Sequence, residues 1–280
     1  MTDAVPDAAL ELRGVSRHYG GKDAWWRRVE PVRAVDGIDL VLRSGETLGI
    51  VGESGSGKST LGRIAAGIEA PSAGSVSFRG EPYAAIGSPA WRRQRRHVQV
   101  VFQNPSQALD PRLSIAAQVR EPMDAHGIDA DGGAIEAMLA RVGLAGLGGR
   151  FPHQLSGGQL QRAVIARALS LSPDVIVCDE AVSALDVSVQ AQILNLLQDL
   201  QAEFGVAFLF ISHDLGVVRH VSHRIAVMRQ GQIVETGPAA EVFARPQHPY
   251  TRALIAALPA ASPAARRQRD ARALASLMKA

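Results

Sequence analysis

The sequence has a single cysteine, Cys178, among its 280 residues. One thiol excludes an internal disulfide bond, a four-thiolate iron–sulfur cluster and a cysteine-based zinc site, and it is consistent with a reducing compartment. Long hydrophobic runs are also lacking, because Val98–Phe102 and 206–211 have only the length of strands, whereas a membrane span needs about 18 to 20 residues. Residues 1–9 include two aspartates and no apolar stretch, which is not typical of a secretory signal. These absences predict a soluble intracellular protein, or one that partners hold at a membrane.

The chain also lacks a strong excess of one charge outside its C-terminal end. The net charge is +3, and residues 262–280 contain five basic residues but only one acidic residue. The rest is close to neutral, so we expect no nucleic-acid partner. Hydrophobic residues make up 46% of the chain, which allows a sizeable core and excludes wholesale disorder. We expect a flexible N-terminus at 1–9, a folded domain at 10–258, and a basic tail rich in Ala and Arg at 259–280.

Predicted strands and helices alternate along the folded domain. Between about 104 and 149, helix formers and breaks marked by Gly and Pro indicate a small helical insertion, and residues 20–31 are interpreted as a surface loop. Continuous apolar runs are typical of strands that are covered on both faces. The alternation predicts an α/β domain with a largely parallel sheet. Strands are expected at 10–15, 32–42, Thr47–Val51, 175–178, Ala207–Ile211, 225–228 and 232–235, and helices at 58–68, 156–171 and Val187–Phe204.

Residues 52–59 have the sequence GESGSGKS, which matches G-x-x-x-x-G-K-[ST] between a predicted strand and a predicted helix. Such a loop can turn its backbone N–H groups toward phosphate oxygens, and a Cβ at Gly55 or Gly57 would obstruct that path. The helix that follows presents free N–H groups and a positive dipole end to the same anion. We expect Lys58 to reach the β- and γ-phosphates and Ser59 to bind Mg²⁺. The sequence therefore predicts a nucleoside triphosphate site.

Two acids follow the apolar run at 175–178, namely Asp179 and Glu180. We expect Asp179 to bind Mg²⁺, directly or through water, and Glu180 to polarise the attacking water. In isolation, such a pair could instead cap a helix. The lysine loop favours the metal site, and Cys178 is interpreted as a small core residue.

Residues 155–159 have the sequence LSGGQ, in which Ser-Gly-Gly opens a predicted helix. This opening offers backbone N–H groups and a hydroxyl to an anion. The chain already has one phosphate loop, so a second anion site indicates a different phosphate or the nucleotide of another molecule. With these motifs the sequence resembles the ATP-binding-cassette (ABC) ATPases over about 10–258. The resemblance implies an α/β P-loop NTPase core of the RecA-like type, with an antiparallel β-subdomain and a helical subdomain at about 104–165.

The resemblance also implies roles for single residues. Tyr19 is expected to stack on adenine, Gln103 to sense Mg²⁺ and the attacking water beside a transmembrane partner, and His213 to contact the γ-phosphate. Residues 183–186 look like the loop that crosses the dimer interface. At 181–182 this chain has Ala-Val where the family often has Pro-Thr, a departure that removes no catalytic group. The expected site has the catalytic residues Lys58, Gln103, Glu180 and His213, the Mg²⁺ ligands Ser59, Gln103 and Asp179, and the ATP-binding residues Tyr19, Gly52, Glu53, Ser54, Gly55, Ser56, Gly57, Lys58, Ser59, Thr60, Ser156, Gly157, Gly158 and Gln159.

Partners are implied by the same resemblance. Two ATPase subunits would pair head to tail, so that the 155–159 turn of one closes over ATP held by residues 52–60 of the other. The second subunit could be a copy of this chain or a paralogue. Two transmembrane permease subunits and an extracytoplasmic solute-binding protein are expected to complete the system, with this chain peripheral on the cytoplasmic face of the bacterial inner membrane.

Two further segments, 181–190 and 245–254, resemble the ATPases of oligopeptide, dipeptide and nickel importers. The loop at 20–31, with Trp25-Trp26, resembles the second ATPase subunit of such systems. Peptide import is the expected function, and nickel, glutathione and opines are also compatible. A non-transport ABC ATPase acting on nucleic acid or ribosomes is the alternative, but it usually has tandem cassettes or strong basic faces. A P-loop kinase would have no use for residues 155–159.

Overall fold

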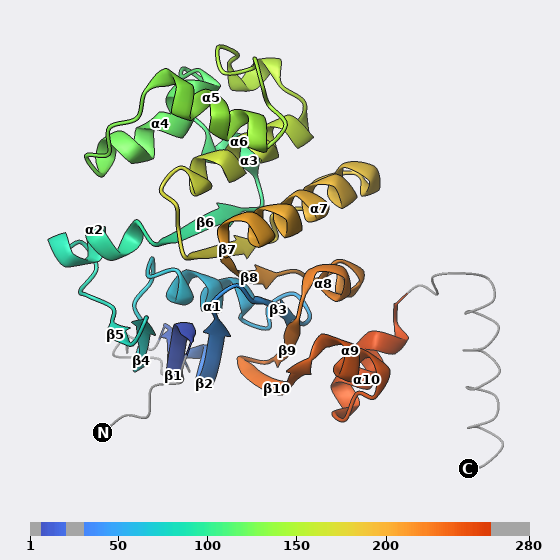
Figure 1. The fold of residues 1–280 in the computed structure, drawn as a ribbon. Coiled ribbons are helices and arrows are strands. Elements are labelled where there is room, and N and C mark those ends of the chain that lie inside the picture. Colours follow the sequence, from blue (N-terminus) through green and yellow to red (C-terminus); the bar gives the residue numbers. More distant parts are fainter. Residues whose placement is uncertain (1–6, 21–30, 259–280) are drawn as a thin grey trace.

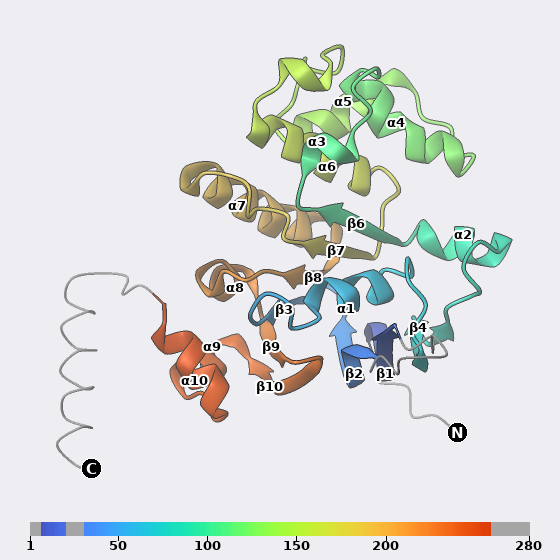
Figure 2. The same cartoon turned by 180° about the vertical axis from the view of Figure 1, so that it is seen from behind.

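The structure is a computed structural model that describes residues 7–20 and 31–258. Predictions about residues 1–6, the tryptophan pair in the 21–30 segment and the 259–280 tail lie outside the described residues. Three layers follow one another from top to bottom in Figures 1 and 2: a group of helices, a central sheet with its flanking helices, and a second sheet beside the C-terminal helices. In the described part of the chain, no helix combines the length and the hydropathy of a membrane span.

The central sheet confirms the predicted α/β class. Its five neighbouring strands from β9 to β6 run parallel, and β10 pairs antiparallel with β9 at one edge. Every residue of β3 and β8 is buried, as expected for apolar runs with both faces covered. The order is β10 (Gln232–Pro238), β9 (Arg224–Arg229), β3 (Thr47–Val51), β8 (Ala207–Ile211), β7 (Val175–Asp179) and β6 (Val98–Phe102).

A second sheet is antiparallel and lies below the central one (Figure 1). Ala8 and Ala9, expected in a flexible N-terminus, already belong to its strand β1, and Ala9 is only 1% exposed. Two adjacent alanines show no alternation of apolar and polar residues, so the sequence pattern predicted that the strand starts at Leu10. The order is β2 (Val32–Arg43), β1 (Ala8–Tyr19), β4 (Ala73–Phe78) and β5 (Glu81–Pro82), and α2 (Pro89–Arg95) leads from it to β6.

Helix α1 (Lys58–Ala65) lies between the two sheets, where it contacts β1, β2, β7 and β8. It is shorter than the predicted helix at 58–68, because Gly67 turns the chain with a φ of +66°. The other face of the central sheet is covered by α7 (Val187–Phe204) and α8 (Leu215–Val221), and α9 (Ala239–Ala244) and α10 (Pro249–Ala256) follow β10. The two faces of the sheet therefore carry two separate hydrophobic cores.

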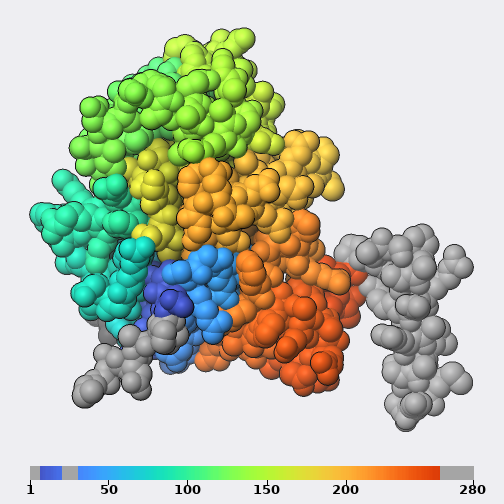
Figure 3. All heavy atoms as spheres, in the orientation of Figure 1, coloured from blue at the N-terminus to red at the C-terminus, as the bar shows by residue number. Residues whose placement is uncertain are grey.

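The helical layer is inserted between β6 and β7. Its last helix begins with a reciprocal cap, since the Ser156 hydroxyl accepts from the Gln159 N–H at 3.3 Å and the Gln159 side chain accepts from the Ser156 N–H at 2.9 Å. Figure 3 shows this layer in green and yellow above the sheet. It consists of α3 (Pro105–Ala108), α4 (Ile115–Ala125), α5 (Gly132–Arg141), the 3-10 turn η1 (Pro152–Gln154) and α6 (Gly157–Leu169).

Candidate nucleotide site

The 52–59 loop joins the end of β3 to the start of α1. A Cβ at Gly57, which has a φ of +102°, would lie 1.9 Å from the carbonyl oxygen of Ala34, and a Cβ at Gly52 would lie 2.1 Å from that of Met228. At Gly55 a Cβ would meet no protein atom within 4 Å, and the constraint that the structure shows there is its φ of +80°. Glycine is thus required by close backbone contacts at two positions.

Several backbone N–H groups of this loop are available to bind a ligand. Those of Ser54, Gly55 and Gly57 have no hydrogen-bond partner among residues 7–20 and 31–258, whereas the N–H of Ser56 donates to the Glu53 carbonyl at 3.2 Å. The first N–H groups of α1 also receive no side-chain cap, because the N-cap residue Gly57 has no side chain. An anion is the ligand that such a set of donors suits.

Lys58 is buried inside the loop, and its Nζ donates to the carbonyl oxygens of Gly52 at 2.9 Å and of Glu53 at 2.8 Å. Burial lowers the pKa of Lys58, and the nearby carboxylates of Glu180, Asp179 and Glu53 oppose that effect. The ammonium group is therefore held between the carbonyls of the loop and the nearby carboxylates. A phosphate would offer it stronger acceptors than the carbonyls do.

Ser59 and Asp179 come together from α1 and β7. The Ser59 hydroxyl donates to Asp179 Oδ1 at 2.9 Å, and burial is the main cause that raises the pKa of Asp179. In the described ranges, no group of three or more His, Cys, Asp or Glu side chains is arranged so that it could hold a metal ion by itself. A hydroxyl and one carboxylate fit Mg²⁺, which usually takes one or two carboxylates together with phosphate oxygens and water.

Glu180 is held in an unusual backbone conformation, with a φ of +52°. Its N–H donates to the Ile211 carbonyl at 3.0 Å, and its own carbonyl accepts from the Ser183 hydroxyl at 2.9 Å. His213, after β8, places Nδ1 3.0 Å from Glu180 Oε1. Such strain persists only where surrounding bonds fix it, and it is common at functional sites. Gln103 directly follows β6 and is exposed, one residue beyond the register pair Phe102–Asp179.

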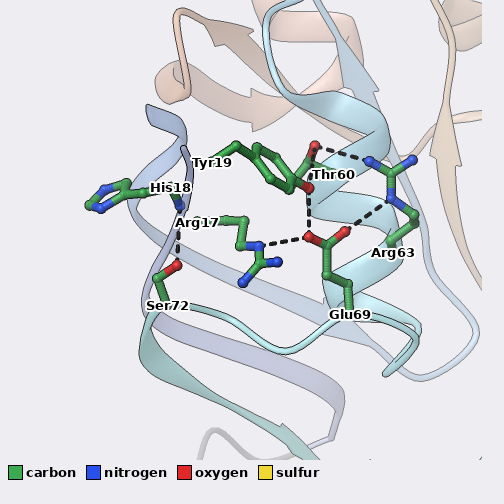
Figure 4. A network of polar contacts seen from close by, with 7 residues as sticks. All are labelled: Arg17, His18, Tyr19, Thr60, Arg63, Glu69 and Ser72. Carbon is green, nitrogen blue, oxygen red and sulfur yellow. Dashed lines mark hydrogen bonds and ion pairs between the residues drawn. The ribbon is translucent and has the colours of Figure 1, made fainter. Parts of the chain in front are cut away.

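Tyr19 belongs to a polar network between β1 and the end of α1 (Figure 4). Its hydroxyl donates to Glu69 Oε1 at 2.5 Å, and that carboxylate also accepts from Arg17 at 2.6 Å and from Arg63 at 3.1 Å. The Tyr19 hydroxyl is 3.5 Å from Thr60 Oγ1. Burial alone would raise the pKa of Glu69, but the hydrogen bonds from Tyr19, Arg63 and Arg17 outweigh it and lower that pKa. The network ties the tyrosine to the helix that follows the phosphate loop.

The 155–159 turn lies in the helical layer, away from the phosphate loop of the same chain. Ser156 and Gly157 are exposed at the start of α6. A Cβ at Gly158 would lie 2.5 Å from Cγ1 of Val189, so the turn packs closely on the start of α7. No hydrogen bond joins this turn to residues 52–60 within the part that the structure describes. The structure thus brings the 52–59 loop, both acids and His213 together and leaves the 155–159 turn apart from them.

Two contacts of the site were not foreseen from the sequence. Glu69 was missed, because an acid after a helix gives no signal of its partner Tyr19 fifty residues earlier. The segment 245–254 was noted as a family feature without a role, yet Tyr250 contacts Glu53 of the phosphate loop. Its tyrosine was the available signal, but nothing in the spacing indicates which loop the hydroxyl reaches.

Comparisons with known proteins agree with this geometry. Residues 35–183 match the family described as ABC transporter. The chain belongs to that family. It is an ATP-binding subunit and ATP hydrolase of the ABC type, and residues 234–279 also match the oligopeptide/dipeptide transporter, C-terminal region. The RecA-like α/β fold and the family resemblance expected from the sequence are confirmed.

Individual relatives of this ABC ATPase are named as import or transport ATP-binding proteins. A putative peptide import ATP-binding protein of Brucella abortus (strain 2308) is 51% identical over 82% of this chain and 70% of its own length. The oligopeptide transport ATP-binding protein AppF of Bacillus subtilis is 45% identical over 92% of this chain and 80% of its own length. The glutathione import ATP-binding protein GsiA of Pectobacterium atrosepticum is 50% identical, and the match spans only 44% of that protein.

Solved structures support the same fold. The structure of cbiO1 from Clostridium perfringens, part of the ABC transporter complex cbiONQ, matches with a TM-score of 0.73 and 28% identity over 85% of this chain and 92% of that one. The ATP-binding cassette MJ0796, in a dimeric post-hydrolysis state bound to ADP and Pi, matches with a TM-score of 0.72 and 29% identity over 82% of this chain and 98% of that one.

Proposed function

We propose that this ABC ATPase energises a bacterial peptide importer, and that its working site is shared between two subunits. The observation that carries the proposal is the separation of two anion-binding turns on one chain. The 52–59 loop and the 155–159 turn lie in different layers, and the latter has exposed residues at a helix start. A second subunit that pairs head to tail would bring the two turns to one nucleotide.

The phosphate loop would bind the phosphates of ATP. Free N–H groups at Ser54, Gly55 and Gly57 would bind phosphate oxygens, and Lys58 would exchange its two carbonyl acceptors for the β- and γ-phosphates. Mg²⁺, when bound, would neutralise charge on the phosphates as the leaving group departs. Ser59 and Asp179 are the residues of this chain that would hold it, with Gln103 nearby as a further oxygen donor.

Glu180 and His213 would take part in proton transfer from the attacking water. Hydrogen bonds to Ile211 and Ser183 fix the backbone of Glu180, and its carboxylate would accept that proton. His213 lies within hydrogen-bond distance of Glu180 and would orient the carboxylate while facing the γ-phosphate. The Ser156 turn of the second subunit would add N–H donors and exclude water. Closure of the pair would therefore be required for hydrolysis.

A hollow of about 510 Å³ supports the contact with a permease. It lies between β6 and the helical layer, one residue from Gln103, and Phe102 in its lining is 43% exposed. Arg95, Glu121 and Arg167 belong to its lining, and the last two form an ion pair. A short permease helix with apolar and polar faces would fit such a hollow. The chain would then sit on the cytoplasmic face of the inner membrane, with a solute-binding protein outside selecting the substrate.

Peptides are the proposed substrate class. The oligopeptide/dipeptide match at 234–279 supports it, as do the names of the relatives, a putative peptide import protein and an oligopeptide transport protein. Glutathione is a tripeptide, so the similarity to GsiA favours the same class and makes glutathione the second candidate.

The test is reconstitution of the chain with its permease and ATPase partners in liposomes, with the solute-binding protein added outside. Short peptides are expected to stimulate ATP hydrolysis and to accumulate inside. Stimulation by nickel alone, with none by peptides or glutathione, would contradict the proposed substrate class. An absence of ATP hydrolysis in the assembled complex would contradict the proposal as a whole.

A further inference from the structure

Helix α10 reaches the phosphate loop through one tyrosine. The backbone N–H of Glu53, the second residue of the loop, donates to the hydroxyl oxygen of Tyr250 at 3.0 Å. The two residues are 197 positions apart in the sequence. Tyr250 lies in the 245–254 segment, which the sequence marks as a family feature without giving it a task.

The start of α10 is built to place this side chain. His248 caps the helix, because its Nδ1 accepts from the Tyr250 N–H at 3.1 Å, and Pro249 occupies the first helical position. Both features fix the backbone at Tyr250. The tyrosine hydroxyl is therefore positioned by the start of a helix.

Glu235 of β10 anchors the same segment to the central sheet. Its carboxylate accepts the N–H of Gln247 at 2.8 Å and that of His248 at 3.0 Å. Burial alone would raise the pKa of Glu235, but these hydrogen bonds outweigh it and lower that pKa. The carboxylate is thus ionised at neutral pH, where hydrogen bonds to a charged acceptor are strongest.

The tyrosine ring is fixed from the side by Arg229. The guanidinium of Arg229, at the end of β9, lies 5.0 Å from the centroid of the Tyr250 ring, a distance typical of a cation–π contact. In Figure 1, α10 lies with α9 beside β10, and in Figure 3 the red atoms of the C-terminal part pack against the orange part of the domain. Met228, near the end of the same strand, has the carbonyl oxygen that leaves no room for a Cβ at Gly52.

Two C-terminal elements therefore hold the loop. Tyr250 binds it at Glu53, and the N–H of Gly231, in the β9–β10 turn, donates to the Ser56 carbonyl at 3.0 Å. Between and beyond these two points, the N–H groups of Ser54, Gly55 and Gly57 stay unpaired with any described residue. The bonded groups are not the ones that are free for phosphate, so the contacts can persist when a nucleotide binds.

We propose that Tyr250 is a positioning residue that orients the phosphate loop, and that the 245–254 segment is a brace on the nucleotide site. This inference depends on the 52–59 loop being the ATP site of the proposed function. Without the hydroxyl, the Glu53 N–H loses its partner, and the start of the loop keeps the bonds from Lys58 and Ser56 to the Glu53 carbonyl. Nucleotide binding must then complete the ordering of the loop. Part of the binding free energy is then spent on that ordering.

The test compares Tyr250→Phe with the wild-type protein in ATP and ADP binding. Loss of one hydrogen bond is expected to weaken both affinities by about two- to tenfold and to raise KM by a similar factor, while kcat at saturating ATP changes by less than about twofold. Inorganic tripolyphosphate, which has no adenine, should lose affinity by the same factor. A shift of kcat with an unchanged KM would overturn the proposal.

Tyr83→Phe is the matched control. It removes a hydroxyl that donates to the Ala65 carbonyl at 2.7 Å, at the far end of α1. It is expected to reduce thermal stability and to leave ATP affinity unchanged. If Tyr250→Phe behaves in the same way, with lower stability and wild-type affinity, Tyr250 only packs and the inference is wrong.

A second variant, Glu235→Ala, releases the start of α10 without changing the tyrosine. We expect the same direction of change in ATP affinity, and less than additive effects when it is combined with Tyr250→Phe, because both act through one contact. Fully additive effects would contradict the shared route. A wild-type protein that binds no ATP would instead contradict the proposed function itself, so the two failures can be told apart.

Discussion

Replacement of Glu180 by Gln tests the chemistry of the site with little disturbance of its shape. The amide keeps the size of the side chain and an oxygen near His213 Nδ1, which lies 3.0 Å from Glu180 Oε1. It cannot accept the proton of an attacking water. A positioned general base contributes about 10²- to 10⁴-fold, so the barrier should rise by about 3 to 5.5 kcal/mol, at about 1.4 kcal/mol for each tenfold.

ATP binding should survive the same change. Lys58 and the loop N–H groups do not depend on the Glu180 carboxylate for their placement, because Lys58 is held by the carbonyls of Gly52 and Glu53. With binding intact and hydrolysis stopped, the ATP-bound pair of subunits should accumulate.

The assay is phosphate release at saturating ATP and Mg²⁺, with size-exclusion chromatography to follow the pair of subunits. Glu203→Gln is the control, since Glu203 lies near the end of α7 and pairs with Arg141 at 2.9 Å. It should hydrolyse ATP at the wild-type rate. Turnover of Glu180→Gln within about threefold of wild type would refute the assignment of Glu180 as the water-polarising group.

Three further changes test other parts of the account. Lys58→Ala should weaken ATP binding by about tenfold or more, since it removes hydrogen bonds from a charged donor; unchanged affinity in a calorimetric titration would remove the phosphate-loop assignment. Ser156→Arg should abolish hydrolysis while the isolated subunit still binds ATP, and retained turnover would refute the shared site. Glu69→Gln should lower the free energy of unfolding at pH 7. The lowered pKa of Glu69 means that its stabilisation exists above the ordinary carboxyl pKa of 4.5 and is lost as the pH falls through the lower folded value. The deficit of the variant in urea unfolding should therefore shrink on acidification, and a deficit that grows toward low pH would contradict the network.

Much of the fold follows from local sequence patterns. The runs at Thr47–Val51 and Ala207–Ile211 are strands with the predicted bounds, because continuous apolar residues suit a strand buried on both faces. Val187–Phe204 is a helix with the predicted bounds, since Asp186 caps its start and Gly205 ends it with a φ of +67°. These signals act between close neighbours, so the sequence alone contains them.

Contacts between distant segments could not be predicted in the same way. The placement of Glu69 under Tyr19 and of Tyr250 on Glu53 depends on how two sheets and α10 pack. The backbone strain at Glu180 is likewise a result of bonds to Ile211 and Ser183. The motifs therefore predict which residues form the site, and the packing decides what orients them.

The central claim is that one ATP is bound between the phosphate loop of one subunit and the 155–159 turn of another. Its most direct test uses an ATP analogue with a photoreactive group on the γ-phosphate. The pair combines this chain carrying Lys58→Ala with a second subunit, a copy or a paralogue, that keeps an intact phosphate loop. The account predicts crosslinks on residues 155–159 of the Lys58→Ala chain. Crosslinks confined to the subunit that supplies the lysine would contradict it.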